Sequence, residues 1–153
     1  MHVKDLMQTD IATLRTNDSL DVAEDIMGMG RFRHLPVVQA DGRLVGIVSQ
    51  RDLLRASVSS LLKVSAHKQQ QWLGKIAVRD VMSKNVVAVE ADTDIEDALK
   101  LLLVEKFGCL PVVENKKLIG ILTDSDLLEY LQRLLREGKS PQTRDRGRPK
   151  TGR

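Results

Sequence analysis

The chain has 153 residues, of which 42% are hydrophobic and 29% charged, and this balance is typical of a globular protein. Its single cysteine, Cys109, excludes an internal disulfide, and the three histidines lie too far apart in the sequence to suggest a metal site, so no metal ligands are expected. No apolar run approaches the ~18 residues that cross a bilayer and the start lacks a signal-like stretch, so a cytoplasmic protein with no membrane contact is expected.

The formal net charge of +3 hides an uneven distribution. From Lys139 onward there are six Lys or Arg and one acid, which leaves 18 basic and 20 acidic residues, a net charge of −2, in residues 1–138. The composition of residues 138–153 predicts a basic disordered tail. One alternative function is weak, salt-sensitive nucleic-acid binding through this tail, which deletion of residues 139–153 would abolish. A solvated tail without a dedicated partner is the expectation.

In chain order, the first half predicts an extended segment, a helix, two strands and a closing helix. The segments are Ile11–Leu14, a helix that starts after the N-cap Asp18 and presents Leu20, Ala23 and Met27 on one face, and the strands Leu35–Val38 and Leu44–Val48. Beyond Leu54 the closing helix is expected to continue through Val58, Leu61 and Leu62, and the polar residues 66–71 then form a crossing segment. Trp72 is expected to pack this linker onto the body.

The second half repeats this order, which indicates an internal duplication. A shift of 75 residues places Val3–Met7 on Val78–Met82 and Leu35–Val38 on Leu110–Val113, and a shift of 74 places Leu44–Ser49 on Leu118–Thr123. The predicted segments are Val86–Val89, a helix with a capping box at Thr93–Glu96 and Ile95, Ala98 and Leu102 on one face, the strands Leu110–Val113 and Leu118–Leu122, and a final helix Leu127–Glu137.

Each copy ends in a hydroxyl followed three residues later by a carboxylate: Ser49 with Asp52, and Thr123 with Asp126. At the start of a helix such a pair lies beside outward-pointing backbone N–H groups, which favour an anion. The hydroxyl can donate to a phosphate and the carboxylate can accept from the two hydroxyls of a ribose. The alternative interpretation is a plain helix cap, and both roles can coexist.

With its two Gly–apolar–apolar–Ser/Thr–x–x–Asp segments, each after an apolar–Pro–Val–Val strand, the sequence resembles a tandem pair of CBS domains, a Bateman module, over about residues 1–136. The resemblance implies an α+β fold of two pseudo-symmetric β-α-β-β-α repeats packed through their small sheets. The expected boundaries are a first repeat at 1–63, a linker at 64–75, a second repeat at 76–137 and the tail at 138–153.

The resemblance also implies a regulatory sensor for AMP, ADP, ATP or S-adenosylmethionine, held in two clefts lined by both repeats. One cleft would use Ile11, Ala12, Phe32, Arg33, Ile121, Thr123, Ser125 and Asp126. The mirror cleft would use Ile47, Ser49, Arg51, Asp52, Val86, Val87, Phe107 and Gly108. No cofactor is required, although Mg²⁺ could accompany a polyphosphate beside Asp124.

The two clefts are not expected to be equivalent, because Arg51 of the first copy corresponds to Ser125 of the second. We therefore hypothesise that the Asp52 cleft favours ATP or ADP and that the Asp126 cleft favours AMP. Catalysis is not expected, since His34, Ser49 and Asp52 lack the features of a nucleophile elbow. The remaining expectations are a homodimer formed through the helices after each motif and an unidentified regulated protein. A dimerisation module with empty clefts is the alternative.

Overall fold

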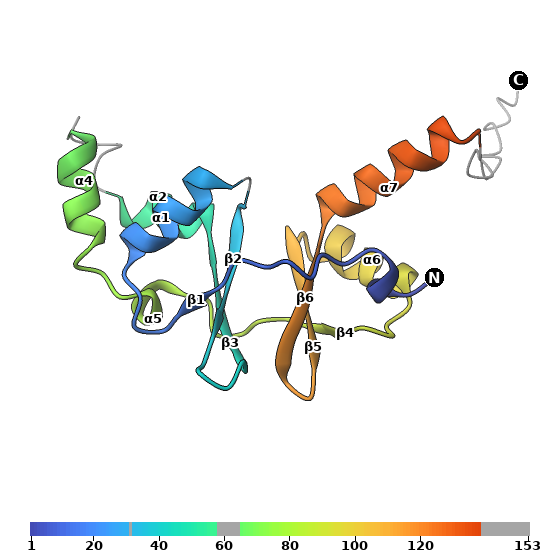
Figure 1. Cartoon of the computed structure of the whole chain (residues 1–153), viewed down its shortest axis with the longest axis horizontal. Helices are drawn as coiled ribbons and strands as arrows, with labels where there is room; N and C mark the ends of the chain where they lie inside the picture. Colours follow the sequence, from blue (N-terminus) through green and yellow to red (C-terminus); the bar gives the residue numbers. More distant parts are fainter. Residues whose placement is uncertain (31, 58–64, 139–153) are drawn as a thin grey trace, which may run out of the picture.

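The computed structural model describes residues 1–30, 32–57 and 65–138. Two units of similar build follow one another along the chain (Figure 1). The elements of the first half are the 3₁₀ turn η1 (Val3–Asp5), β1 (Leu14–Arg15), α1 (Leu20–Met29), β2 (His34–Val38), β3 (Leu44–Ser49) and α2 (Gln50–Ala56). Those of the second half are α4 (Ala66–Leu73), α5 (Val78–Val81), β4 (Val89–Glu90), α6 (Ile95–Val104), β5 (Cys109–Glu114), β6 (Lys117–Thr123) and α7 (Asp124–Arg136).

Each unit contains one small mixed sheet. The strand orders are β1-β2-β3 and β4-β5-β6, with a parallel first pair and an antiparallel hairpin in both. The two sheets lie side by side with the helices outside them (Figure 1), and their hairpin tips are joined where Leu44 N donates to Lys116 O and Leu118 N to Gly42 O. The expected α+β fold of two repeats packed through their sheets is confirmed.

The opening turn of each repeat packs into the core of the other repeat. Val3, which is fully buried, belongs to the apolar cluster of the second unit, together with Leu6 and Met7. Val78, also fully buried, belongs to the cluster of the first unit. The chain begins beside α6 of the second unit and runs to β1 of the first unit, and after α5 it returns to β4 of the second unit (Figure 1).

Backbone hydrogen bonds fix this exchange. Val3 N donates to Thr93 O at 2.9 Å, and Val78 N donates to Asp18 O at 2.7 Å. The boundaries at residues 1 and 76 therefore describe the repeat in the sequence, whereas each packed core takes its opening turn from the other repeat.

Both predicted helix caps are wrong by one residue. The N-cap of α1 is Ser19, because the Asp18 carboxylate accepts from Arg15 N at 2.7 Å and closes the turn before the helix. The N-cap of α6 is Asp94, whose side chain accepts from Glu96 N at 2.8 Å, while Thr93 is occupied with Glu90 N.

The extended segments also begin later than expected. Pairing starts at Leu14 and Val89, so Ile11, Ala12 and the pair Val86–Val87 precede the strands as unpaired backbone. Since these residues make no ladder bonds, their main-chain groups stay open to other partners.

The linker contains a helix where a crossing segment was predicted. In α4, Ser65 caps the first turn by accepting from Lys68 N, and Gln69 Nε2 donates to Glu24 on α1 at 3.0 Å. Leu73 is buried in the first core, and Trp72 Nε1 donates to Ala56 O at 3.0 Å. The expected packing of Trp72 onto the body is therefore present, although the ring is 47% exposed.

The helix after β3 ends at Ala56 instead of continuing, and the predicted continuation through Val58, Leu61 and Leu62 lies outside the described residues, as does the tail beyond Gly138. Among the helices of the described chain, none has both the length and the apolar character needed to cross a membrane.

Candidate functional site

The two hydroxyl–carboxylate pairs stand at the starts of α2 and α7 and form capping boxes. Asp52 Oδ2 accepts from Ser49 N at 2.7 Å and from Ser49 Oγ at 3.0 Å. Asp126 Oδ2 accepts from Thr123 N at 2.7 Å and from Thr123 Oγ1 at 2.8 Å. The capping role is therefore present in both copies, and it uses one oxygen of each carboxylate.

Each pair lies close to the stretch of chain that precedes the first strand of the other repeat. Gln8 exchanges both backbone hydrogen bonds with Ile121, at 2.8 and 2.9 Å, two residues before Thr123. Ser83 does the same with Ile47, at 2.9 and 3.1 Å, two residues before Ser49. Each hydroxyl–carboxylate pair therefore follows, by two residues, a position that is hydrogen-bonded to the other repeat.

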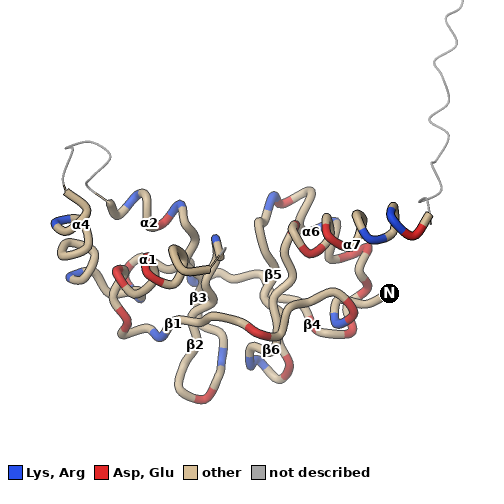
Figure 2. The backbone as a smooth tube through the Cα atoms, turned by 45° about the horizontal axis from the view of Figure 1, so that its top comes forward, with Lys and Arg blue, Asp and Glu red and all other residues tan. Residues whose placement is uncertain are grey.

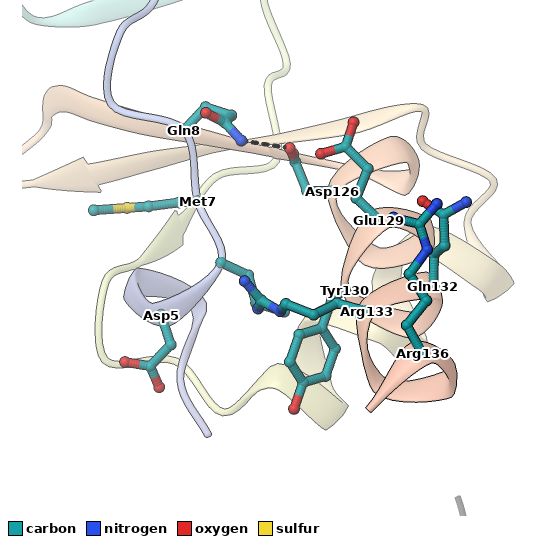
Figure 3. A pocket seen from close by; sticks show the side chains of 10 residues that line it. Asp5, Met7, Gln8, Asp126, Glu129, Tyr130, Gln132, Arg133 and Arg136 are labelled. Carbon is teal, nitrogen blue, oxygen red and sulfur yellow. Dashed lines mark hydrogen bonds between the residues drawn. The ribbon is translucent and has the colours of Figure 1, made fainter. Parts of the chain in front are cut away.

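Gln8 reaches further and touches the second pair directly. Its Nε2 donates to Asp126 Oδ1 at 2.9 Å (Figure 3). Gln8 was not among the residues predicted from the sequence, because a glutamine beside the repeated Met7 and Met82 indicates nothing about ligands. The one signal was the difference between the copies, since serine occupies the matching position 83.

The glycines of the two motifs lie against methionines of the other repeat. A Cβ on Gly46 would lie 2.5 Å from Met82 Sδ, and one on Gly120 would lie 2.6 Å from Met7 Sδ. Each glycine thus leaves room for the close approach of the other repeat, in addition to lying just before the hydroxyl–carboxylate pair.

Four further expected residues have contacts or exposures that the structure describes. Phe32 is 43% exposed and its ring folds back over Gly30, while Arg33 O accepts from Gln50 N at the start of α2. Arg51 is exposed on the first turn of α2, and Phe107 packs partly against the second core.

His34 lies directly against Gly108 of the other repeat. A Cβ on Gly108 would come within 2.5 Å of His34 Cε1 and 2.8 Å of Nε2, so only glycine leaves room for the imidazole. Burial lowers the pKa of His34 below its ordinary value of 6.5, partly opposed by the carboxylate of Asp124. Arg33 and Arg51 also lower this pKa, and Asp52 raises it, so charges from both helix starts act on the ring.

We expect stability to fall as the pH drops from about 6.5 through the lower pKa of the folded His34, because the unfolded chain then binds the proton more readily. Above that range the contribution is fully present. Urea unfolding at about pH 5 and about pH 7.5 should show a smaller pH difference for His34→Gln than for the wild type. His67→Gln, at an exposed position of α4, is the control; an unchanged difference in His34→Gln would contradict the role of His34.

The thiol of Cys109 is a poor nucleophile in this structure. Burial, followed by the nearby Asp124 carboxylate, raises the pKa of the Cys109 thiol to about 12, so the thiolate nucleophile is scarce at neutral pH. Within residues 1–30, 32–57 and 65–138 no three His, Cys, Asp or Glu side chains gather as metal ligands.

A pocket of about 610 Å³ lies between the N-terminal segment and α7 (Figure 3). Its lining residues are Asp5, Leu6, Met7, Gln8, Asp126, Glu129, Tyr130, Gln132, Arg133 and Arg136. Asp126 is the one predicted site residue among them. Helix α7 is acidic in its first turn and basic in its last (Figure 2), and Arg133 lies over the Tyr130 ring at 5.3 Å.

The comparisons with known proteins agree with this geometry. The family model described as "CBS domain" matches residues 3–59 and 78–133. The chain belongs to the CBS-domain family. It is 37% identical over 134 residues to a CBS domain-containing protein of Dictyostelium discoideum, covering 87% of this chain and 92% of that one.

Two solved structures of CBS-type proteins are also similar. A putative acetoin utilization protein of Vibrio cholerae has a TM-score of 0.76 and 32% identity, over 92% of this chain and 98% of the other. CBSX2, solved in complex with AMP, has a TM-score of 0.72 and 31% identity, over 88% of this chain and 98% of the other. The CBS pair described here therefore has the architecture of relatives that include an AMP-bound protein.

Proposed function

We propose that this CBS pair is a regulatory, non-catalytic module that binds an adenosine-type ligand in the clefts between its repeats. The supporting observation is the reciprocal pairing of Gln8 with Ile121 and of Ser83 with Ile47, which brings each hydroxyl–carboxylate pair to the opening segment of the other repeat. The AMP complex of the similar CBSX2 supports the same ligand class.

In the first proposed cleft the Asp126 carboxylate accepts the ribose hydroxyls and Arg33 approaches the phosphate. Thr123 donates to the phosphate only when its hydroxyl gives up the bond to Asp126. Open backbone at Ile11 and Ala12 contacts the adenine edge. The other contributors to this cleft are Phe32, Ile121 and Ser125.

In the mirror cleft Asp52 accepts the ribose hydroxyls and Arg51 approaches the phosphate. Ser49 donates to the phosphate only when its hydroxyl gives up the bond to Asp52. An arginine fork binds phosphate bidentately, which favours ATP or ADP in this cleft. The residues that would enclose the ligand are Ile47, Val86, Val87, Phe107 and Gly108.

A thermal-shift panel with AMP, ADP, ATP and S-adenosylmethionine, with and without Mg²⁺, tests this function. A ligand at 100 times its Kd adds about 2.7 kcal/mol of stability, which corresponds to a shift of about 5–10 °C for a chain of this size. Calorimetry on each hit then gives the affinity and the number of sites.

The matched control is the double variant Asp52→Asn with Asp126→Asn. Asparagine keeps one oxygen for the capping bonds but removes the charge and the second carboxylate oxygen, so the fold should persist while the shift disappears. Absence of any shift in the wild type would leave the dimerisation module with empty clefts as the function.

We further propose that the module is a homodimer that signals to a regulated protein through its outer helices. Leu54 on α2 and its repeat counterpart Leu128 on α7 are 63% and 64% exposed. Leu131 and Leu135 continue the stripe on α7, which has no buried residue of its own and projects from the body (Figure 1). A second copy would cover this apolar surface. Cytoplasmic location stays a prediction.

A further inference from the structure

The carboxylates of Asp52 and Asp126 hold equivalent positions in the two repeats but differ in one contact. Both accept the two capping bonds on Oδ2. Asp126 accepts a third bond on Oδ1, from Gln8 Nε2 at 2.9 Å. In the part of the chain that the structure describes, Asp52 accepts only from Ser49.

This difference matters because a ribose diol donates two hydrogen bonds. An ionised carboxylate offers about four lone-pair sites. At Asp52 two are taken and two remain, which is enough for a diol. At Asp126 three are taken, so a diol can make both bonds only if the Gln8 amide moves away.

The asymmetry arises from one side chain and not from the backbone. Gln8 and Ser83 form the same two-bond pairing with Ile121 and Ile47, and each partner lies five residues before its carboxylate. The serine side chain is two atoms shorter than that of glutamine, and its hydroxyl makes no corresponding bond to Asp52 among the described contacts. Gln8 is exposed, so its amide is free to rotate away from Asp126.

We propose that Gln8 is an affinity-determining residue that competes with the ribose for Asp126 and makes this cleft weaker than the Asp52 cleft. The inference rests on the proposed adenosine-binding function and deepens it, since it assigns the order in which the two clefts fill. For any one ligand the Asp52 cleft fills first, and the Asp126 cleft fills at a higher ligand concentration. The hypothesised preference of the Asp126 cleft for AMP compares AMP with ATP within that one cleft, so it is a separate quantity from this order of filling.

Calorimetry with AMP on full-length single-cleft variants tests the proposal. Asp52→Asn leaves the Asp126 cleft, and adding Gln8→Ser should tighten AMP binding there about tenfold, the effect of removing one competing bond to a carboxylate. Asp126→Asn leaves the Asp52 cleft, and adding Ser83→Gln should weaken AMP binding there by a similar factor. Both changes keep the backbone pairing and the capping boxes.

A second readout uses 2′-deoxy-AMP, which lacks one hydroxyl of the diol. The loss of affinity relative to AMP should be larger for the Asp52 cleft than for the Asp126 cleft, and Gln8→Ser should raise the loss at Asp126 to the Asp52 level.

The outcomes distinguish a failure of the proposed function from a failure of the proposed role of Gln8. No AMP binding by the wild type, or full binding by the Asp52→Asn, Asp126→Asn double variant, would overturn the proposed function itself. If AMP binding depends on the carboxylates but Gln8→Ser leaves the affinity unchanged or weakens it, only the proposed role of Gln8 is overturned. A weakened affinity would identify Gln8 as a contact of the ligand.

Discussion

Replacement of Val3 by Asp is expected to destabilise the second half of the molecule, although Val3 is near the N-terminus of the first repeat. Its side chain is fully buried in the cluster around β5 and β6. An unpaired carboxylate in that cluster should cost about 3–5 kcal/mol. Hydrogen exchange followed by mass spectrometry should therefore show lost protection in Cys109–Thr123 before His34–Ser49.

Val78→Asp is the matched variant, because Val78 is equally buried in the first core. Its effect should be the reverse, with protection lost first in β2 and β3. Thr9→Asp, on the surface of the same N-terminal segment, controls for the one added negative charge. Equal loss of protection in both sheets for Val3→Asp and Val78→Asp would contradict the exchange of opening turns.

Paired substitution of Leu128 and Leu131 by Asp is expected to convert the proposed dimer into a monomer. In a two-fold dimer each substitution occurs twice, so four leucines are lost from the interface, each of which contributes about 1–2 kcal/mol on burial. The dimer Kd should rise by about a hundredfold or more. Sedimentation velocity over a range of concentrations measures this change.

The folded monomer should survive, because Leu128 and Leu131 are 64% and 40% exposed and belong to neither core. Gln132→Asp adds a charge to the same helix on the side that lines the pocket, and it should leave the dimer intact. A wild-type protein that sediments as a monomer at about 100 μM would refute the dimer proposal.

The architecture could be predicted because it depends on local patterns that occur twice. Short apolar runs joined by polar turns placed both hairpins within about a residue of β2, β3, β5 and β6. The helical spacing of Leu20 and Ala23 marked a face that is buried. Such patterns depend on neighbours along the chain, and these neighbours stay the same wherever the repeats dock.

The exchange of opening turns could not be predicted, because the two turns have nearly the same sequence. Val3 and Val78 have the same neighbours in sequence, so either turn fits either core equally well as a pattern. What decides between the cores is the path of the chain between units, and periodicity contains no information on it. Helix α4 was missed for a related reason, because its polar residues are held by partners on α1 that lie 45 positions away.

The candidate site was predicted as a set of residue types but not as a set of contacts. Ser49, Asp52, Thr123 and Asp126 stand at helix starts, as expected from their spacing. The contact of Gln8 with Asp126 depends on how the crossing segment aligns with β6, and the packing of His34 on Gly108 depends on how the sheets meet.

The reciprocal insertion of Val3 and Val78 has a consequence for how such a chain arises from a smaller one. A single repeat on its own would expose an unfilled hole and a loose apolar turn, and two separate copies would satisfy each other by mutual insertion. Joining their genes end to end would keep every contact of that pair. The association of two separate chains would then become a folding step within one chain. The tandem chain is, in this physical sense, an interlocked pair of subunits made permanent by one covalent connection.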